Sequence, residues 1–142
     1  MNKTNPAAKQ ATIDHLNLSV RNYQEAVEWY RRVFGFKEVE AGGDSHTIDR
    51  WGILKSGDTM LCIYERKDLA SASAGKVDHH QISHFGMRVH EVEVWEKTLK
   101  ECGLKTYFGS PVRYPHSQSW YVKDPSGHTI EVSNWMDGRI QF

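Results

Sequence analysis

The sequence IDHLNLSV at residues 13–20 returns as ISHFGMRV at residues 82–89, with Ile, His and Val at the same places. In both copies large apolar side chains alternate with polar or small ones, which is typical of a strand with one face in the core. His15 and His84 hold equivalent positions on the polar face. The repeat predicts that the chain contains two copies of one structural unit.

A helical pattern follows each of these strands. Residues 22–34 carry apolar side chains at helical spacing, with Asn22 and Glu25 as a capping pair at the start and Gly35 as the stop. The pattern recurs at residues 92–102 and ends before Gly103. Each unit is therefore predicted to continue with an amphipathic helix of about three turns.

Three strands are predicted after each helix, separated by glycine-containing turns at residues 41–44, 56–58 and 124–127. The predicted strands span residues 36–41, 47–55 and 59–66 in the first unit and 104–108, 117–123 and 129–135 in the second. An Ala- and Ser-rich linker at 67–80 joins the units. We predict one α+β domain over residues 1–142, made of two tandem βαβββ modules at about 12–66 and 81–136, whose helix-free faces form a curved cavity.

Composition narrows the range of functions. A chain of 142 residues fits one domain, and its formal charge of zero at pH 7 gives no basic field for nucleic acid. We find no apolar run of the roughly 18 residues needed to span a membrane and no secretory signal in the polar start of the chain. Cys62 and Cys102 are interpreted as buried free thiols. These features predict a cytoplasmic protein that acts on a small molecule, without nucleic-acid or membrane partners.

Glu131 joins the two equivalent histidines as a third candidate metal ligand. It lies between Ile130 and Val132, so strand alternation turns it toward the same cavity as His15 and His84. A carboxylate there costs free energy unless it is paired, and two histidines with one carboxylate suit a catalytic divalent metal. The structural alternative is that both histidines belong to the core and that Glu131 pairs with Arg88.

Four stretches of sequence together resemble one superfamily. These are residues 13–18, 29–36, 83–86 and, most specifically, YVKDPSGHTIE at 121–131. They resemble the glyoxalase, bleomycin-resistance and extradiol-dioxygenase superfamily, also called vicinal oxygen chelate, over about residues 12–136. The resemblance implies paired βαβββ modules around one divalent ion (Fe, Mn, Zn or Ni), with His15, His84 and Glu131 as ligands. It also implies a substrate that chelates the metal through neighbouring oxygens, and a homodimer in which two subunits share each site.

The number of ligands separates the branches of this superfamily. The lactoylglutathione-lyase branch takes a fourth ligand from the last strand of the first module. Aligning the turn at Gly57 with the turn at Gly127 places Leu61 opposite Glu131, and leucine cannot bind a metal. A three-ligand centre is instead similar to extradiol dioxygenases and fosfomycin-resistance proteins, so little glutathione-hemithioacetal isomerase activity is expected.

The same two branches suggest residues around the metal. Tyr121 and Ser119 are the predicted catalytic residues, with Tyr121 or a metal-bound water exchanging the proton. The predicted substrate pocket contains Asn17, Trp51, Arg88, Arg113 and His116. The predicted function is a metal-dependent enzyme of the dioxygenase or fosfomycin-resistance type. The alternatives are an isomerase of the lactoylglutathione-lyase type and a metal-free binding protein of the bleomycin-resistance type, with walls formed by Trp51, Trp120, Tyr121 and Trp135.

Overall fold

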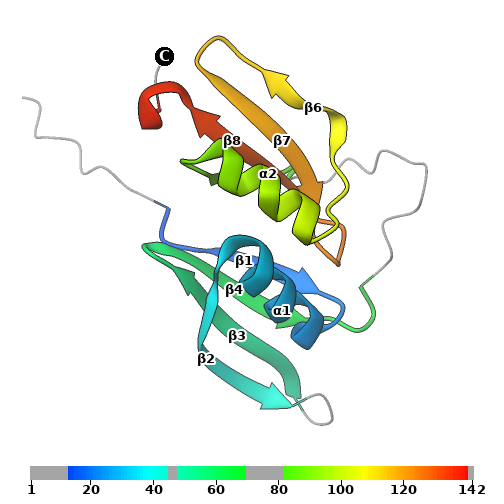
Figure 1. The fold of residues 1–142 in the computed structure, drawn as a ribbon. Helices are drawn as coiled ribbons and strands as arrows, with labels where there is room; N and C mark the ends of the chain where they lie inside the picture. Colours follow the sequence, from blue (N-terminus) through cyan, green and yellow to red (C-terminus); the bar gives the residue numbers. More distant parts are fainter. Residues whose placement is uncertain (1–12, 45–47, 70–81, 141–142) are drawn as a thin grey trace, which may run out of the picture.

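The computed structural model describes residues 13–44, 48–69 and 82–140. Within them the chain forms two four-stranded mixed sheets, each accompanied by one helix (Figure 1). This is the predicted α+β architecture of two βαβββ modules, and the repeat in the sequence is a repeat in the structure.

Both modules have the same strand order. Module 1 consists of β1 (Leu16–Val20), α1 (Tyr23–Phe34), β2 (Lys37–Asp44), β3 (Ile48–Ser56) and β4 (Thr59–Glu65), in the sheet order β1-β4-β3-β2. Module 2 consists of β5 (Phe85–Arg88), α2 (Val92–Glu101), β6 (Tyr107–Arg113), β7 (Ser117–Lys123) and β8 (Thr129–Trp135), in the sheet order β5-β8-β7-β6. A short 3-10 helix, η1 (Met136–Gly138), follows β8. In each sheet the first strand pairs in parallel with the last, and both first strands lie at a sheet edge.

The helix signals in the sequence act as expected. The Asn22 side chain accepts a hydrogen bond from the Glu25 backbone N–H, and Gly35 ends α1 in the left-handed conformation with φ of 72°. The predicted boundaries of α1 are therefore confirmed. Helix α2 ends at Glu101, and its C-cap Cys102 is followed by Gly103, which has φ of 60°.

Several strand predictions were wrong in extent. The strands predicted to begin at Ile13 and Ile82 begin at Leu16 and Phe85, so His15 and His84 stand immediately before β1 and β5. Residues 41–44 belong to β2 and do not form a turn, because Gly42 serves close packing: a Cβ there would lie 2.6 Å from Cζ2 of Trp51. The strand predicted at 104–108 is found at 107–113, displaced along the chain and irregular. Most of the predicted linker, residues 70–80, lies outside the described residues.

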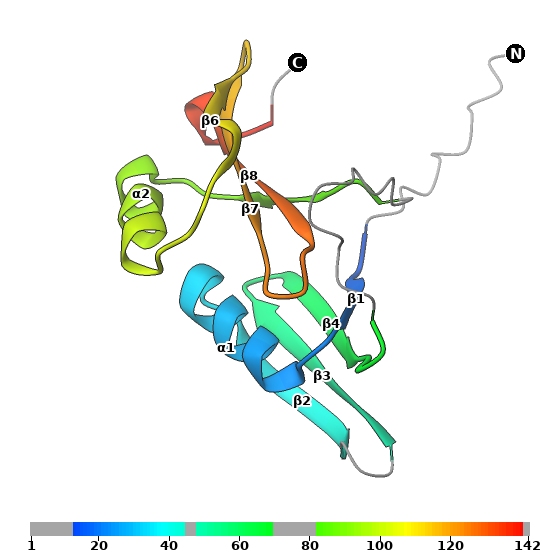
Figure 2. The same ribbon diagram turned by 90° about the vertical axis from the view of Figure 1, so that its right-hand side faces the viewer.

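The modules meet through their helices and the turn between β7 and β8. Both helices lie on the left in Figure 2, and the rings of Phe34 and Trp95 stack with their centroids 5.6 Å apart. The buried Tyr30 hydroxyl donates a 2.8 Å hydrogen bond to Oδ2 of Asp124 in the β7–β8 turn. These contacts leave side chains on the helix-free faces, such as Asn17 and His84, exposed.

No helix in the described part of the chain combines the length and apolar character needed to cross a membrane.

Candidate metal centre

His84 and Glu131 contact each other on the helix-free face of module 2. Glu131 pairs with Gly86 across β5 and β8, and His84 precedes that pair by two residues on the same face. His84 Nε2 lies 2.9 Å from Glu131 Oε2, and the two side chains are 41% and 21% exposed. Glu131 therefore pairs with His84, whereas the alternative from the sequence was a pair with Arg88. Imidazole nitrogen and carboxylate oxygen, half open to solvent, are suitable donors for a divalent ion.

Two serines form a short chain of hydrogen bonds that ends at the Glu131 carboxylate. Ser133 Oγ donates to Glu131 Oε1 at 3.4 Å, and Ser119 Oγ lies 3.1 Å from Ser133 Oγ. Ser119, a predicted catalytic residue, is fully buried. It contacts Ser133 and therefore acts on Glu131 through that residue. Sequence reasoning missed Ser133, although it stands two positions after Glu131 on the same strand face.

Tyr121, the other predicted catalytic residue, lies beside the pair. It is the register partner of Glu131 across β7 and β8, and its ring meets the His84 ring edge-on at 5.9 Å. Burial, a 2.8 Å hydrogen bond with the Tyr114 hydroxyl and the charge of Glu131 together raise the pKa of Tyr121. The phenol is therefore protonated at neutral pH and is able to donate a hydrogen bond to a ligand oxygen.

His15 lies on module 1, away from the other two predicted ligands. Its Nδ1 is 2.6 Å from Oδ1 of Asp14, and its side chain is 45% exposed. Among the residues that the structure describes, no three His, Cys, Asp or Glu side chains come together as a metal site. Within one chain two of the three predicted ligands thus lie together in module 2, and the third stands just before β1 of module 1.

The strand register corrects the alignment of the two modules. Asn17 pairs with Cys62 in module 1 as Gly86 pairs with Glu131 in module 2. The turn glycines are not equivalent, because two residues separate β3 from β4 and five separate β7 from β8, and Cys62 follows Gly57 by five residues whereas Glu131 follows Gly127 by four. Cys62, not Leu61, therefore stands opposite Glu131, and placing Leu61 there was wrong by one residue. Leu61 is buried on the helix side of the sheet. Burial and the nearby Asp14 carboxylate raise the pKa of the Cys62 thiol.

The five predicted pocket residues are spread over both modules. Asn17 and Trp51 are on β1 and β3 of module 1, while Arg113 and His116 lie exposed at the end of β6 and in the loop after it. Arg88 ends β5 and lines a hollow between the modules. Of the proposed aromatic walls, Trp120 is 2% exposed and belongs to the core, which excludes it from a binding surface.

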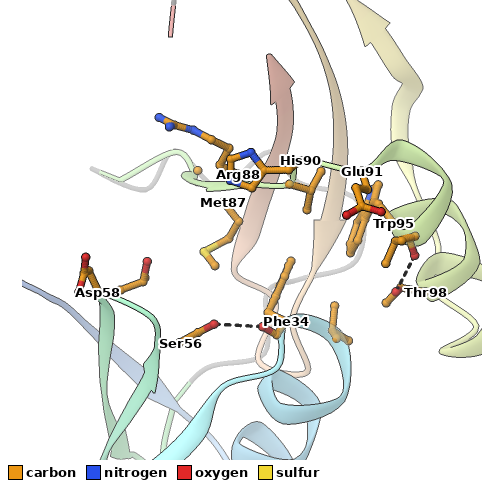
Figure 3. A pocket seen from close by; sticks show the side chains of 14 residues that line it. Phe34, Ser56, Asp58, Met87, Arg88, His90, Glu91, Trp95 and Thr98 are labelled. Carbon is orange, nitrogen blue, oxygen red and sulfur yellow. Dashed lines mark hydrogen bonds between the residues drawn. The ribbon is translucent and has the colours of Figure 1, made fainter. Parts of the chain in front are cut away.

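The hollow beside Arg88 has a volume of about 820 Å³ and lies where the modules meet (Figure 3). Met87 and Phe34 point into it, and its lining also includes Trp95 of α2 and Glu91, the residue just before that helix. His84 and Glu131 are not among the residues that line it, although Gly86, the register partner of Glu131, is.

Comparison with known proteins identifies the family and agrees with the fold. The sequence profile of the Glyoxalase/Bleomycin resistance protein/Dioxygenase superfamily matches residues 12–132. A glyoxalase family protein from Enterococcus faecalis superposes with a TM-score of 0.72 at 20% identity, over 87% of this chain and 97% of that one.

A second similar structure contains a metal. It is a variant of the fosfomycin resistance protein FosX from Listeria monocytogenes, complexed with Mn(II) and 1S,2S-dihydroxypropylphosphonic acid. It superposes with a TM-score of 0.69 at 18% identity, over 89% of this chain and 94% of that one. At this identity the likeness concerns the fold, whereas the profile covers most of the sequence. The chain belongs to the Glyoxalase/Bleomycin resistance protein/Dioxygenase superfamily.

Proposed function

We propose that the protein is a divalent-metal-dependent enzyme that acts on a small molecule able to chelate the metal through neighbouring oxygens. The observation that carries this proposal is the 2.9 Å contact between His84 Nε2 and Glu131 Oε2 on an open sheet face. Without a cation, an imidazole and a carboxylate pair only weakly at that exposure. With a divalent ion, both become ligands of the type found in catalytic centres.

We infer that the third ligand comes from a second copy of the chain, so that His15 of one subunit completes the His84–Glu131 pair of the other in a homodimer. Two features support this arrangement. His15 directly precedes β1 of one sheet, whereas His84 directly precedes β5 of the other sheet, which also carries Glu131. Within the described residues β1 and β5 are edge strands of their sheets. Next to these edges Ile13 and Ile82 are 92% and 61% exposed, an apolar surface that a partner would bury.

The residues of the chain have separate roles in this proposal. A divalent ion at the site supplies Lewis acidity toward a ligand oxygen. Tyr121 donates a hydrogen bond to a neighbouring oxygen, and Ser133 holds the Glu131 carboxylate in its orientation. Asp14 orients His15 through Nδ1, which leaves Nε2 as the free ligand atom.

Two reaction types are retained, ring-cleaving dioxygenation and opening of an epoxide phosphonate. The FosX complex with Mn(II) and a diol phosphonic acid supports the second by fold likeness. Isomerase chemistry of the lactoylglutathione-lyase type is disfavoured, because Cys62 stands where a fourth carboxylate ligand is required. The neutral net charge supports a small-molecule partner over nucleic acid, and the two free cysteines are compatible with a cytoplasmic location.

Metal analysis tests the proposal. Protein re-equilibrated with Fe(II), Mn(II), Zn(II) or Ni(II) is expected to hold about one ion per chain, and Glu131→Gln is expected to weaken binding by about tenfold or more. Absence of metal under all four conditions would leave a metal-free ligand-binding protein as the function. Oxygen uptake with catechols on the Fe(II) form, compared with addition of water or a thiol to an epoxide phosphonate on the Mn(II) form, then separates the two reaction types.

A further inference from the structure

The hollow between the modules has the size and the position of a small-molecule site. Its volume of about 820 Å³ falls within the range of about 300–1,000 Å³ that is usual for ligand pockets, which often form where two structural units meet. The stacked rings of Phe34 and Trp95, one from each module, belong to its wall. Because neither His84 nor Glu131 lines it, the hollow is a candidate site in addition to the metal centre.

The middle and one end of the hollow are apolar. Met87 and Phe34 point into it, and Trp95 lies at one end with its ring nearly parallel to that of Phe34, at an interplanar angle of 9° (Figure 3). Met87 and Phe34 are only half-buried, and Val94, which also lines the hollow, is 58% exposed. Aromatic rings and thioethers both interact favourably with a further ring. This part of the hollow therefore suits the aromatic group of a ligand.

Two side chains of opposite charge lie at the other end of the hollow. Arg88, at the end of β5, and Asp58, in the β3–β4 turn, both line it, and Figure 3 shows them on the side away from Trp95 and Glu91. Neither side chain has a hydrogen-bond or ion-pair partner among the described residues. The guanidinium is therefore available to a carboxylate of a ligand, and the Asp58 carboxylate to an ammonium group. Charge complementarity favours a ligand that carries both groups.

We propose that the hollow binds a free aromatic α-amino acid, with its carboxylate on Arg88, its ammonium group on Asp58 and its ring against Met87 and Phe34. An α-amino acid carries one charge of each sign on a single carbon atom, which matches one charged side chain of each sign at one end of the hollow. A compact inorganic anion would make no use of the apolar part, and an uncharged apolar molecule would make no use of the two charges. The site goes beyond the proposed function and does not depend on a metal ion.

Calorimetric titration of the full-length protein with L-phenylalanine, after treatment with a chelator, tests the proposal. L-alanine lacks the ring, 3-phenylpropionate lacks the ammonium group and 2-phenylethylamine lacks the carboxylate. Each is expected to bind at least about tenfold more weakly than L-phenylalanine, because it loses one of the three contacts.

Variants of the two charged residues test their roles. Arg88→Gln and Asp58→Asn are each expected to weaken binding of L-phenylalanine by about tenfold. The matched controls are Arg32→Gln and Asp68→Asn, which remove the same charges from exposed positions outside the lining and are expected to leave binding unchanged. Val94→Trp places a large ring in the hollow from an exposed position of α2, so it is expected to prevent binding and to leave the melting temperature unchanged.

Several results would overturn the inference. These are no binding of L-phenylalanine by the unmodified protein, equally tight binding of 3-phenylpropionate or 2-phenylethylamine, and unchanged binding by Arg88→Gln, Asp58→Asn or Val94→Trp. Glu131→Gln is expected to bind L-phenylalanine like the unmodified protein, and its loss of binding would place the amino acid at the candidate metal centre instead. Because every titration uses metal-free protein, the result is independent of whether the proposed metal centre holds an ion.

Discussion

Cys62 occupies in module 1 the place that Glu131 occupies in module 2. Each is the register partner of the residue two positions after the module's histidine, Asn17 after His15 and Gly86 after His84. The two modules therefore present one His–Glu pair and one His–Cys combination on equivalent faces. In the proposed metal centre, module 2 would therefore supply the carboxylate and one imidazole, and module 1 a single imidazole.

Cys62→Glu tests this register directly. We expect the variant to fold and to bind divalent metal more tightly, because a carboxylate at this position faces the same side as His15. Leu61→Glu is the matched comparison and is expected to lose about 3 kcal/mol or more of stability, since it places a charge in the apolar core. Urea denaturation and metal titration of both variants provide the measurement. The reverse pattern, with a stable Leu61→Glu and an unfolded Cys62→Glu, would show that the register is wrong.

Tyr30 and Asp124 join the modules through a buried hydrogen bond, and Tyr30→Phe leaves the buried carboxylate with one donor fewer. The variant is expected to lose about 1–3 kcal/mol of unfolding free energy at pH 7. The control is Tyr64→Phe, whose ring is half-buried in module 1. An equal loss in both variants would argue against a specific role for the contact between modules.

The raised pKa of Tyr30 predicts how the free energy of unfolding depends on pH. Burial and the Asp124 charge raise the pKa of Tyr30 well above 10, so the folded chain keeps this proton where the unfolded chain loses it. Its contribution is complete below about pH 10 and decreases as the pH rises further. Unfolding free energies measured between pH 8 and 11 should fall less steeply for Tyr30→Phe than for the unmodified protein. Parallel curves would contradict the assignment.

Trp95 stacks on Phe34 between the helices, and its Nε1 is buried without a hydrogen-bond partner among the described residues. Trp95→Phe keeps an aromatic ring and removes the unpaired donor, so we expect a loss below about 1.5 kcal/mol. Trp95→Ala is expected to cost about 3–5 kcal/mol through the cavity it creates. Chemical denaturation distinguishes them, and similar losses in both variants would mean that the indole N–H has a partner.

Local signals in the sequence were sufficient for the fold. The alternation around His15 and His84, the Asn22 cap and the Gly35 stop predicted β1, β5 and α1 because they depend on neighbouring residues alone. The position of Cys62 opposite Asn17 depends on the length of the β3–β4 turn. The contact of Ser133 with Ser119 depends on the pairing of β7 with β8. Neither is encoded in a local pattern.

The position of Phe108 illustrates a further limit. Its left-handed backbone arises from a bulge that Ser110 stabilises, and a Phe followed by Gly gives no sign of this in the sequence. The separation of His15 from Glu131 depends on how two modules pack, which the equivalence of the repeats does not reveal. The candidate ligands were thus identified by symmetry, whereas their distances from one another depend on the three-dimensional arrangement of the modules.

The central claim is that one metal centre is shared between two chains, and subunit complementation tests it most directly. His15→Ala and Glu131→Gln are co-expressed with different tags, and the mixed dimer is isolated on both tags. In a shared arrangement one of the two sites in the mixed dimer contains all three intact ligands. The mixed dimer should therefore bind about one metal ion with the affinity of the unmodified protein, whereas each variant alone binds metal at least about tenfold more weakly. No metal in the mixed dimer, under conditions in which the unmodified protein binds about one ion per chain, would contradict the account.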